Sequence, residues 1–257
     1  MQVFDYEFGG DVDQLKILGL SDLHLEDPLC DTRRAVQFVE EVRSEDNTYC
    51  IVNGDVFNNA TRTSVSDAWG NRMDIDTAID EVVALLDPIK EKILVLTDGN
   101  HEKRSYRDHN RLLVKDVSRI LGINDRYSFG PYLLYMAFGK NQGRDCRKTV
   151  YSLYGKHGSG GGRRVGSKFN KLEDMLSTIN ADIFLHSHTH VEGAFRLSSA
   201  SVDYRNRKPI FKDHLFVNTA AYLEHGGYGE EAGYRPVSTV YPRIYLRGEE
   251  RFAQALI

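Results

Sequence analysis

Three histidines alternate with small or hydroxylated residues in the segment His186-Ser187-His188-Thr189-His190. The segment follows the apolar run Ile183-Phe184-Leu185, so we expect it where a buried strand ends in a loop. Neutral imidazole is a common metal ligand, whereas histidines gathered at a strand end gain little from burial and repel one another when protonated. Alternating histidines also fit one solvated strand face. On this segment alone, metal binding and a solvated face weigh equally.

Potential ligands also follow other apolar runs of the chain. They are Asp22 and His24 after residues 15–20, Asp55 after 49–52, Asn100 and His101 after 92–96, and His157 after 149–154. Such a mixed nitrogen and oxygen donor set suits Mn, Fe, Ni or Zn better than Ca²⁺ or Mg²⁺. Each group alone is typical of an ordinary turn. Their repetition at successive strand ends indicates a shared metal site.

Helical segments connect the first three strands. Apolar residues recur at helical spacing over 35–42, after the potential cap Asp31-Thr32, and over 75–86, before Asp87-Pro88. Strands that alternate with helices imply parallel crossovers, and ligands in such sheets lie beyond the carboxyl ends of the strands. We therefore expect the polar groups after these strands to converge in space.

The second half of the chain contains further predicted elements. Helices are expected over 112–121 and 169–179, an antiparallel pair over 132–138 and 149–154, and strands over 183–185, 191–197, 210–217 and 243–246. No internal repeat and no linker marks a second domain. We expect one domain over residues 1–257.

At these motifs the chain resembles the calcineurin-like metallophosphoesterases. The family pattern is D-x-H, G-D, G-N-H-D/E, a lone H and G-H-x-H. It reads here Asp22-Leu23-His24, Gly54-Asp55, Gly99-Asn100-His101-Glu102, His157 and Ser187-His188-Thr189-His190. Ser187 replaces the glycine of the last motif, which matters only if the backbone there needs a positive φ angle. The resemblance covers residues 21–190 and implies a two-sheet sandwich with helices on the outer faces (α/β/β/α).

The resemblance also implies a dinuclear site. The first divalent ion would be held by Asp22, His24, Asp55 and His190, and the second by Asp55, Asn100, His157 and His188, with Asp55 bridging. Manganese is the expected metal, with iron, zinc or nickel as alternatives. The ions would attract a phosphate ester and share a hydroxide that attacks phosphorus. His101 is the implied catalytic residue at the phosphoryl group and leaving oxygen, and Glu102 either orients it or is an exposed loop residue.

Basic and glycine-rich segments flank these motifs. Gly158–Gly162, with Arg163 and Arg164, follows His157 and is either a phosphate-binding loop or merely flexible. Eight basic residues form either a basic rim that binds an extended polyanion or ordinary solvated helix faces. They are Lys103, Arg104, Arg107, Arg111, Arg163, Arg164, Lys168 and Lys171. His186 could support the ligands, whereas His109, His214 and His225 are expected at the surface or in the core.

These features favour a phosphodiesterase that acts on a nucleic acid or a nucleotide. Gly54-Asp55-Val56-Phe57 resembles the repair-nuclease branch of the family, although too few residues follow His190 for a sizeable DNA-capping domain. The first alternative is a phosphomonoesterase acting on a nucleotide, a small phosphate or a phosphoprotein. The second alternative is a metal-stabilised binding module without catalysis.

Composition restricts the partners. The 257 residues are 41% hydrophobic and carry a net charge of −4, with a pI near 6.1, which argues against a surface-wide nucleic-acid or membrane footprint. No stretch suits a signal peptide or a membrane span, so we expect a soluble, cytoplasmic protein whose partner is a phosphate-ester substrate. Cys30, Cys50 and Cys146 are widely spaced, which predicts neither a disulfide framework nor a thiolate metal site.

Overall fold

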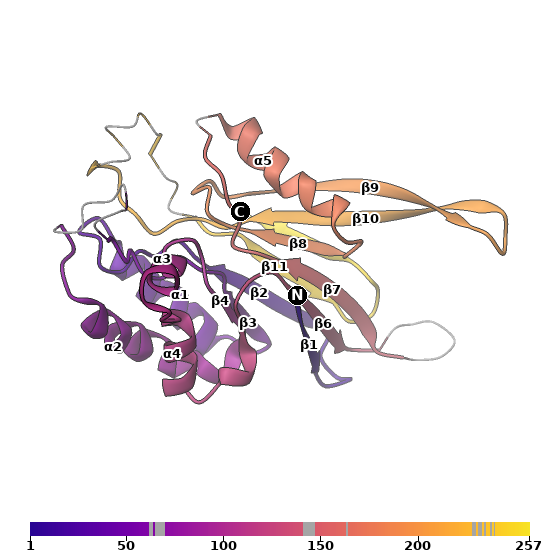
Figure 1. Ribbon diagram of the computed structural model, residues 1–257. Helices are drawn as coiled ribbons and strands as arrows, with labels where there is room; N and C mark the ends of the chain where they lie inside the picture. Colours follow the sequence, from indigo (N-terminus) through magenta and orange to yellow (C-terminus); the bar gives the residue numbers. More distant parts are fainter. Residues whose placement is uncertain are drawn as a thin grey trace.

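The computed structural model describes residues 1–61, 64, 70–140, 147–162, 164–227, 230, 233, 235–236, 238 and 240–257. Within these residues, two sheets of six strands each stack face to face between layers of helices (Figure 1). The expected two-sheet α/β/β/α sandwich is therefore confirmed. Cys30 and Cys50 are buried free thiols, and Cys146 lies outside the described residues.

The sheet that carries the first three motifs is largely parallel. Its strands are β2 (Gln14–Leu20), β3 (Thr48–Val52), β4 (Ile93–Thr97), β5 (Tyr127–Ser128), β11 (Arg243–Arg247) and β12 (Ala253–Leu256). Their order is β12-β11-β2-β3-β4-β5, with β2 to β5 parallel and β11 antiparallel to β2. The parallel order places the ends of β2, β3 and β4 at one edge, as predicted.

Helices connect these strands and cover the outer face of their sheet. They are α1 (Thr32–Ser44), α2 (Ile75–Leu86), α3 (Glu102–His109) and α4 (Leu113–Ile120), with 3₁₀ turns η1 (Asp87–Lys92) and η2 (Asn124–Arg126). The Asp31 carboxylate caps α1 by accepting from the Arg34 amide at 3.1 Å. Helix α3 was not predicted, because only Glu102 and Ser105 are buried on it and no apolar stripe marks it.

The second sheet is mixed. Its strands are β1 (Gln2–Glu7), β6 (Tyr132–Phe138), β7 (Thr149–Gly155), β8 (Ile183–His186), β9 (Gly193–Asp203) and β10 (Lys208–Asn218), in the order β1-β6-β7-β8-β10-β9. Strands β7, β8 and β10 are parallel, so they also end at one edge. Helix α5 (Val165–Glu173) and the 3₁₀ turn η3 (Asp174–Ser177) cover the outer face, where one longer helix was expected.

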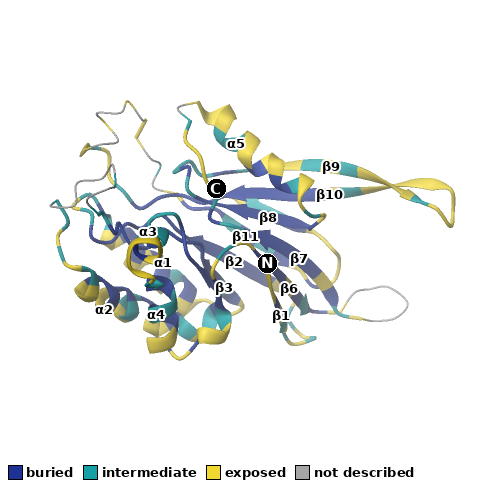
Figure 2. Ribbon diagram, viewed as in Figure 1, coloured by how far each residue is buried: buried dark blue, intermediate teal, exposed yellow. Residues whose placement is uncertain are grey.

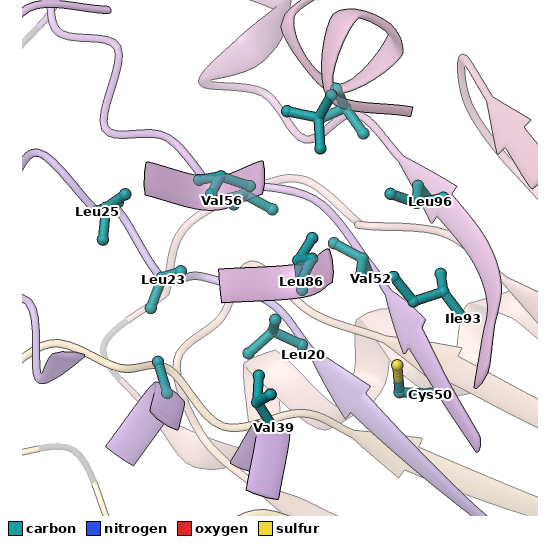
Figure 3. Close-up of a cluster of buried hydrophobic side chains, with 14 of the residues drawn as sticks. Leu20, Leu23, Leu25, Val39, Cys50, Val52, Val56, Leu86, Ile93 and Leu96 are labelled. Carbon is teal, nitrogen blue, oxygen red and sulfur yellow. The ribbon is translucent and has the colours of Figure 1, made fainter. Parts of the chain in front are cut away.

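Three apolar layers hold the sandwich together. Between the sheets, Ile17, Ile51 and Val95 belong to the same cluster as Leu134 and Leu185. Alternate residues of the parallel strands face the helices, where Leu20, Val52 and Leu96 lie near Val39 and Leu86 (Figure 3). On the opposite side, Leu172 and Met175 pack against Phe184 and Phe216. Burial is thus continuous across both sheets, whereas the helix surfaces and the β9–β10 hairpin end are exposed (Figure 2).

Backbone hydrogen bonds join the strand ends within each sheet and also link one sheet to the other. Asp22 donates to the carbonyl of Gly54 at 3.0 Å, and Ser187 donates to the carbonyl of His157 at 2.9 Å. Tyr222, beyond the end of β10, donates to the carbonyl of Asp22 at 3.0 Å and so links one sheet to the other. The motif loops are therefore parts of one hydrogen-bonded edge. Among the described helices, none combines the length and apolar character that a membrane crossing needs.

Candidate metal centre

The loops at this edge have an unusual backbone conformation. Positive φ angles occur at Asp22 (51°), His24 (48°), Asp55 (50°), His188 (70°) and His190 (55°). Aspartate and histidine tolerate this region better than most residues, and such strain gathers at functional sites. Ser187 is not among the positive-φ residues, so serine can replace the family's glycine there without backbone strain.

The first cluster combines the first and last motifs. The Oδ1 atom of Asp22 lies 3.2 Å from Nε2 of His190. One donor atom each from Asp22, His24 and His190 lie within 4.8 Å of one another. The carboxylate and both imidazoles therefore surround a space of the size that a metal ion occupies.

The second cluster lies beside the first. Its carboxylate, that of Asp55, also lies close to His24 of the first cluster. Donor atoms of Asp55, His157 and His188 lie within 4.8 Å of one another, and so do those of His24, Asp55 and His101. The Nε2 atom of His157 is 3.1 Å from Oδ2 of Asp55. The Asp55 carboxylate thus reaches both clusters, which is the arrangement that a bridging ligand needs.

Asn100 completes the set of converging side chains. Its Oδ1 atom lies 3.2 Å from Nε2 of His157, so the amide oxygen points into the second cluster. The structure therefore brings together all seven of the residues that the sequence motifs selected.

Unpartnered donors provide a direct test of whether these residues fit a metal. Both ring nitrogens of His24 are buried without a hydrogen-bond partner, and so is Nδ1 of His188. Buried polar atoms are otherwise almost always paired, and an unpaired one costs about 1–3 kcal/mol. A cation coordinated by one nitrogen of a ring would satisfy that nitrogen. The His and Asp clusters fit a dinuclear divalent metal site.

The electrostatics of the clusters agree with this fit. Burial holds the pKa of His24 well below its ordinary value, so its imidazole is neutral and free to coordinate. Although burial would raise the pKa values of Asp22 and Asp55, nearby histidines hold both below the ordinary range. Burial would lower the pKa of His157, yet Asp55 and Asp22 raise it to about 10. The carboxylates thus favour positive charge at the place where the cations would lie.

Two glycines allow the central loops to approach closely. A Cβ atom on Gly54, whose φ is +85°, would lie 2.5 Å from the amide nitrogen of Gly99. A Cβ atom on Gly99 would in turn overlap the Asp55 carboxylate. These positions require glycine because the Asp55 side chain fits directly against the backbone of the next loop.

Glu102 fastens the same two loops from behind. Its carboxylate accepts hydrogen bonds from the amides of Gly99 (2.7 Å), Asp55 (3.0 Å) and Phe57 (3.1 Å). Burial, reinforced by Asp55 and Asp98, raises its pKa to about 8. Orientation of His101 by Glu102 is therefore not observed, and the alternative of an exposed loop residue is also wrong. Glu102 holds the loop that presents Asp55.

His101 is held by other groups. Its Nδ1 atom lies 2.6 Å from the carbonyl of Asn58, and its Nε2 atom lies 3.0 Å from Nη2 of Arg104. The carbonyl can only accept, so Nδ1 carries the proton and Nε2 accepts from the Arg104 guanidinium. Nε2 also lies 3.9 Å from Oδ2 of Asp55. His101 thus presents Nε2 to the clusters with its ring orientation fixed by Asn58.

The Asn58 loop has its own buried anchor. The Glu26 carboxylate accepts from the amides of Asn58 at 2.7 Å and Asn59 at 3.0 Å. The Asn59 side chain donates to the carbonyl of His101 at 2.6 Å. Glu26 therefore supports His101 indirectly, a role that nothing in the D-x-H motif indicates.

A buried network of side chains connects the two clusters. Asn53 Nδ2 lies 2.6 Å from Ser187 Oγ, which accepts from Thr219 at 2.8 Å. The Thr219 hydroxyl lies 2.5 Å from Ser21 Oγ, and Ser21 donates to the Asp22 carboxylate at 2.7 Å. The carbonyl of Asn53 lies 2.8 Å from Nδ1 of His157. Hydrogen bonds thus run from a ligand of the first cluster to a ligand of the second.

Sequence reasoning missed Asn53, Thr219 and Glu26, and it assigned Arg104 only to a possible basic rim. A usable signal existed for Thr219, because it directly follows β10, which runs parallel to β8, so it lies at the same edge as the other polar groups. Asn218 lies 2.8 Å from Nδ1 of His186, and a Cβ atom on Gly158 would contact that imidazole. His186 therefore lies behind the loop of His157, which agrees with a supporting position.

The remaining predicted residues lie apart from the clusters. His214 is a core residue that forms hydrogen bonds with the Ala181 carbonyl and the Ser199 hydroxyl, whereas His109 and His225 are exposed. Arg111 is paired with Asp76 and Asp116. Arg164 is exposed beside the glycine-rich loop, and Arg163 lies outside the described residues. A phosphate-binding role for Arg163 and Arg164 stays a prediction.

Comparisons with known proteins assign the family. A family model described as calcineurin-like phosphoesterase matches residues 15–192, more than half of the chain. No curated protein matches. One similar solved structure is a conserved uncharacterized protein from Streptococcus pneumoniae TIGR4, described as a predicted phosphoesterase, with 15% identity, a TM-score of 0.38, and coverage of 95% of this chain and 98% of that one.

A second similar structure is GAP50, described as the anchor in the inner membrane complex of Plasmodium. It is 11% identical, with a TM-score of 0.43 and coverage of 95% of this chain and 89% of that one. The assignment rests on the family model and on the motifs that converge at the metal centre. The chain belongs to the calcineurin-like phosphoesterase family.

Proposed function

We propose that the chain hydrolyses phosphoesters at a dinuclear metal site. The proposed ligands of the first ion are Asp22, His24, Asp55 and His190, and those of the second are Asp55, Asn100, His157 and His188. The observation that carries this assignment is the position of Asp55, whose carboxylate is shared by donor groups on either side. A single ion held by Asp55, His157 and His188 would leave the separate group of Asp22, His24 and His190 unused.

The residues of the chain divide the chemical tasks. Bound divalent cations would supply Lewis-acid activation of a water and of the phosphoryl group. Nε2 of His101 faces the clusters, and after the ring takes up a second proton at this nitrogen it would deliver that proton to a leaving oxygen. Arg104 donates toward the same nitrogen and is half-buried, so it places a fixed positive charge next to the phosphoryl position.

We propose a phosphodiester of a nucleic acid or nucleotide as the substrate. Support comes from the Gly54-Asp55-Val56-Phe57 motif and from Arg104, which adds local positive charge to a chain with a net charge of −4. Lys168, from the predicted basic rim, lies near the last motif, because its Nζ donates to the carbonyl of Thr189 at 2.7 Å. Phosphate contacts from such residues suit a polyanion.

Parallel assays test the substrate class. The Mn²⁺-loaded protein would be given p-nitrophenyl phosphate, bis-p-nitrophenyl phosphate and labelled single- and double-stranded DNA. The proposal expects faster hydrolysis of the diesters. Preference for the monoester would instead support the phosphatase alternative, and no hydrolysis of any substrate would support a binding module.

Manganese is the proposed metal. Imidazole, carboxylate and amide ligands together suit it, but the same donors accept iron, zinc and nickel. Elemental analysis of protein purified without added metal, followed by assays after reconstitution with each ion, would distinguish them. Highest activity with an ion other than Mn²⁺ would overturn the manganese proposal while leaving the site intact.

A further inference from the structure

Two exposed aromatic residues lie in contact beside the metal centre. Tyr106 of α3 and Phe129, in the turn after β5, form this aromatic pair, whose rings meet edge to face with centroids 4.9 Å apart. Tyr106 is 40% exposed and Phe129 is 43% exposed, so the core leaves much of both rings open. Burial of aromatic surface is favourable, and the pair therefore offers a ligand apolar area to cover.

The strand order places the aromatic pair at the same edge as the metal ligands. Phe129 directly follows β5, which runs parallel to β4, so it lies beside the loop that carries Asn100. The chain then enters β6 at Tyr132, which pairs with Gly155, two residues before His157. The aromatic pair is thus next to the second cluster of proposed ligands.

Helix α3 connects the aromatic pair to the reaction site. His101 is the N-cap of this helix. A rise of 1.5 Å per residue places Tyr106 about 7.5 Å along the helix axis from His101. A nucleoside joined to a phosphoryl group at the metal centre would therefore reach the aromatic pair.

The other exposed aromatic residues of the described chain lie elsewhere. Tyr135 is within β6, and Phe252 precedes β12. Tyr204 and Phe211 are at the turn end of the β9–β10 hairpin, away from the edge where β10 ends. Within the described residues, only the aromatic pair combines exposed rings with a position at the metal edge.

Basic side chains without an acid partner surround the aromatic pair. Nζ of Lys103 lies 5.6 Å from the centre of the Phe129 ring. Among the described side chains, no carboxylate is within ion-pair distance of the basic residues in the first turns of α3, which are Lys103, Arg104 and Arg107. By contrast, Arg111 and Arg119 both pair with Asp116. A chain of net charge −4 thus keeps uncompensated positive charge next to its metal centre, which suits phosphate groups.

We propose that the aromatic pair stacks against a nucleobase of a single-stranded nucleic acid whose phosphodiester lies at the metal centre. The proposal rests on the phosphodiesterase function proposed above and specifies its substrate as single-stranded. Stacking on a side chain requires an unstacked base, which a duplex does not offer. Lys103 and Arg107 would contact the phosphates that flank this base. The aromatic pair would bind the substrate and take no part in the chemical step.

Strands with and without bases test the proposal. The Mn²⁺-loaded protein would be given a labelled oligothymidine and an abasic strand of the same length. The KM of the wild type is expected to be about tenfold lower for oligothymidine, and Phe129→Ala should remove this difference without changing kcat. Equal KM values of the wild type for the two strands, or a preference for duplex DNA, would overturn the proposal while leaving phosphodiester hydrolysis intact.

The matched control is Phe211→Ala, which removes an exposed phenylalanine far from the metal edge. It should leave the KM for both strands unchanged. Circular dichroism would show that each variant is folded. If Phe211→Ala raises the KM for oligothymidine and Phe129→Ala does not, the strand binds along the β9–β10 hairpin and the proposal is wrong.

Fluorescence provides a readout that does not depend on hydrolysis. Phe129→Trp, in a background where the only natural tryptophan is removed by Trp69→Phe, places a single fluorophore in the aromatic pair. Oligothymidine is expected to quench its emission, and the abasic strand is not. Quenching without hydrolysis would support the base contact and contradict the proposed activity. Hydrolysis of oligothymidine without quenching would support the activity and overturn the base contact.

Discussion

Asn53 and Ser187 join the two sheets by a hydrogen bond of 2.6 Å between Nδ2 and Oγ, directly behind the metal centre. Asn53 follows β3 and Ser187 follows β8, so each belongs to a different sheet. Asn53 also donates to the carbonyl of Lys156 and accepts from Tyr132, both at 3.0 Å. The serine that departs from the family motif is therefore part of a fully buried network.

Asn53→Ala is expected to destabilise the protein and weaken metal binding together. It leaves the buried Tyr132 hydroxyl and the Lys156 carbonyl unpaired, which would lower the free energy of unfolding by about 3 kcal/mol. Urea unfolding in the presence of a chelator measures this loss, and Mn²⁺ titration measures affinity. Ser187→Gly should also destabilise the protein, because it removes the hydroxyl that accepts from Asn53 and Thr219 at a position where no positive φ favours glycine. Unchanged Mn²⁺ affinity in folded Asn53→Ala would contradict the positioning role.

Glu102→Gln is expected to loosen the loop of Asp55. A glutamine offers one acceptor oxygen, whereas the Glu102 carboxylate accepts from three backbone amides through two oxygens. The substitution leaves at least one of these buried amides without an acceptor, which should reduce the free energy of unfolding by about 1–3 kcal/mol. Chemical unfolding without metal, at a pH above the Glu102 pKa of about 8, measures this loss, with the exposed residue Glu173 changed to Gln as control. Equal stability of both variants would contradict the anchoring role.

His101→Ala is expected to keep both metal ions and lose most turnover. Removal of a general acid typically reduces kcat by about 10²–10⁴-fold. Elemental analysis and steady-state kinetics on the same preparation would separate the two effects. His109→Ala, at the exposed end of the same helix, should change neither. Loss of metal in His101→Ala would show that His101 is a ligand instead.

Asp55→Asn is expected to lower the occupancy of both ions. The Asp55 carboxylate lies in two of the three groups of donor atoms, so an amide at this position should weaken the binding of both ions. Elemental analysis after dialysis measures the occupancy, and Asp22→Asn, in one donor group only, provides the comparison. If Asp55→Asn loses only one ion, Asp55 does not bridge.

Glu41 gives the fold a defined acid sensitivity away from the metal centre. Although burial would raise its pKa, hydrogen bonds from Arg243, Lys16 and Tyr241 lower it to about 2. A depressed pKa contributes stability above the unfolded value near 4.5, and this stability is lost as pH falls toward about 2. Urea unfolding from pH 7 to 2 should show that Glu41→Gln is less stable at pH 7 and less sensitive to acid. Glu40→Gln, exposed on the same helix, is the control, and an identical pH profile of the two variants would contradict this account.

Much of the metal centre could be predicted because its residues follow buried parallel strands. Ile51 and Val52 are apolar toward both faces of the sheet, so the polar residues after them mark the strand end. The apolar runs 15–20, 92–96 and 183–185 marked three more strand ends in the same way. The sandwich itself came from the family resemblance, since strand and helix patterns do not determine how two sheets stack.

Other elements lacked such a signal. Strand β1 is an edge strand whose alternate positions carry Asp5 and Glu7, so no apolar run reveals it. Helix α3 is polar almost all round and is held by the Asn59 and Glu26 contacts around His101. Glu102 looked like a loop acid because sequence cannot show three amides pointing at one carboxylate. Supporting contacts of this kind depend on the assembled fold rather than on local spacing.

The most direct test is a metal titration of activity. Metal-free protein would be titrated with Mn²⁺ while hydrolysis of bis-p-nitrophenyl phosphate is followed, at protein concentrations above the dissociation constant. Two cooperating ions predict that the rate rises until two equivalents per chain are bound and then stays constant. A plateau at one equivalent, or no hydrolysis at any equivalence, would contradict the proposed dinuclear mechanism.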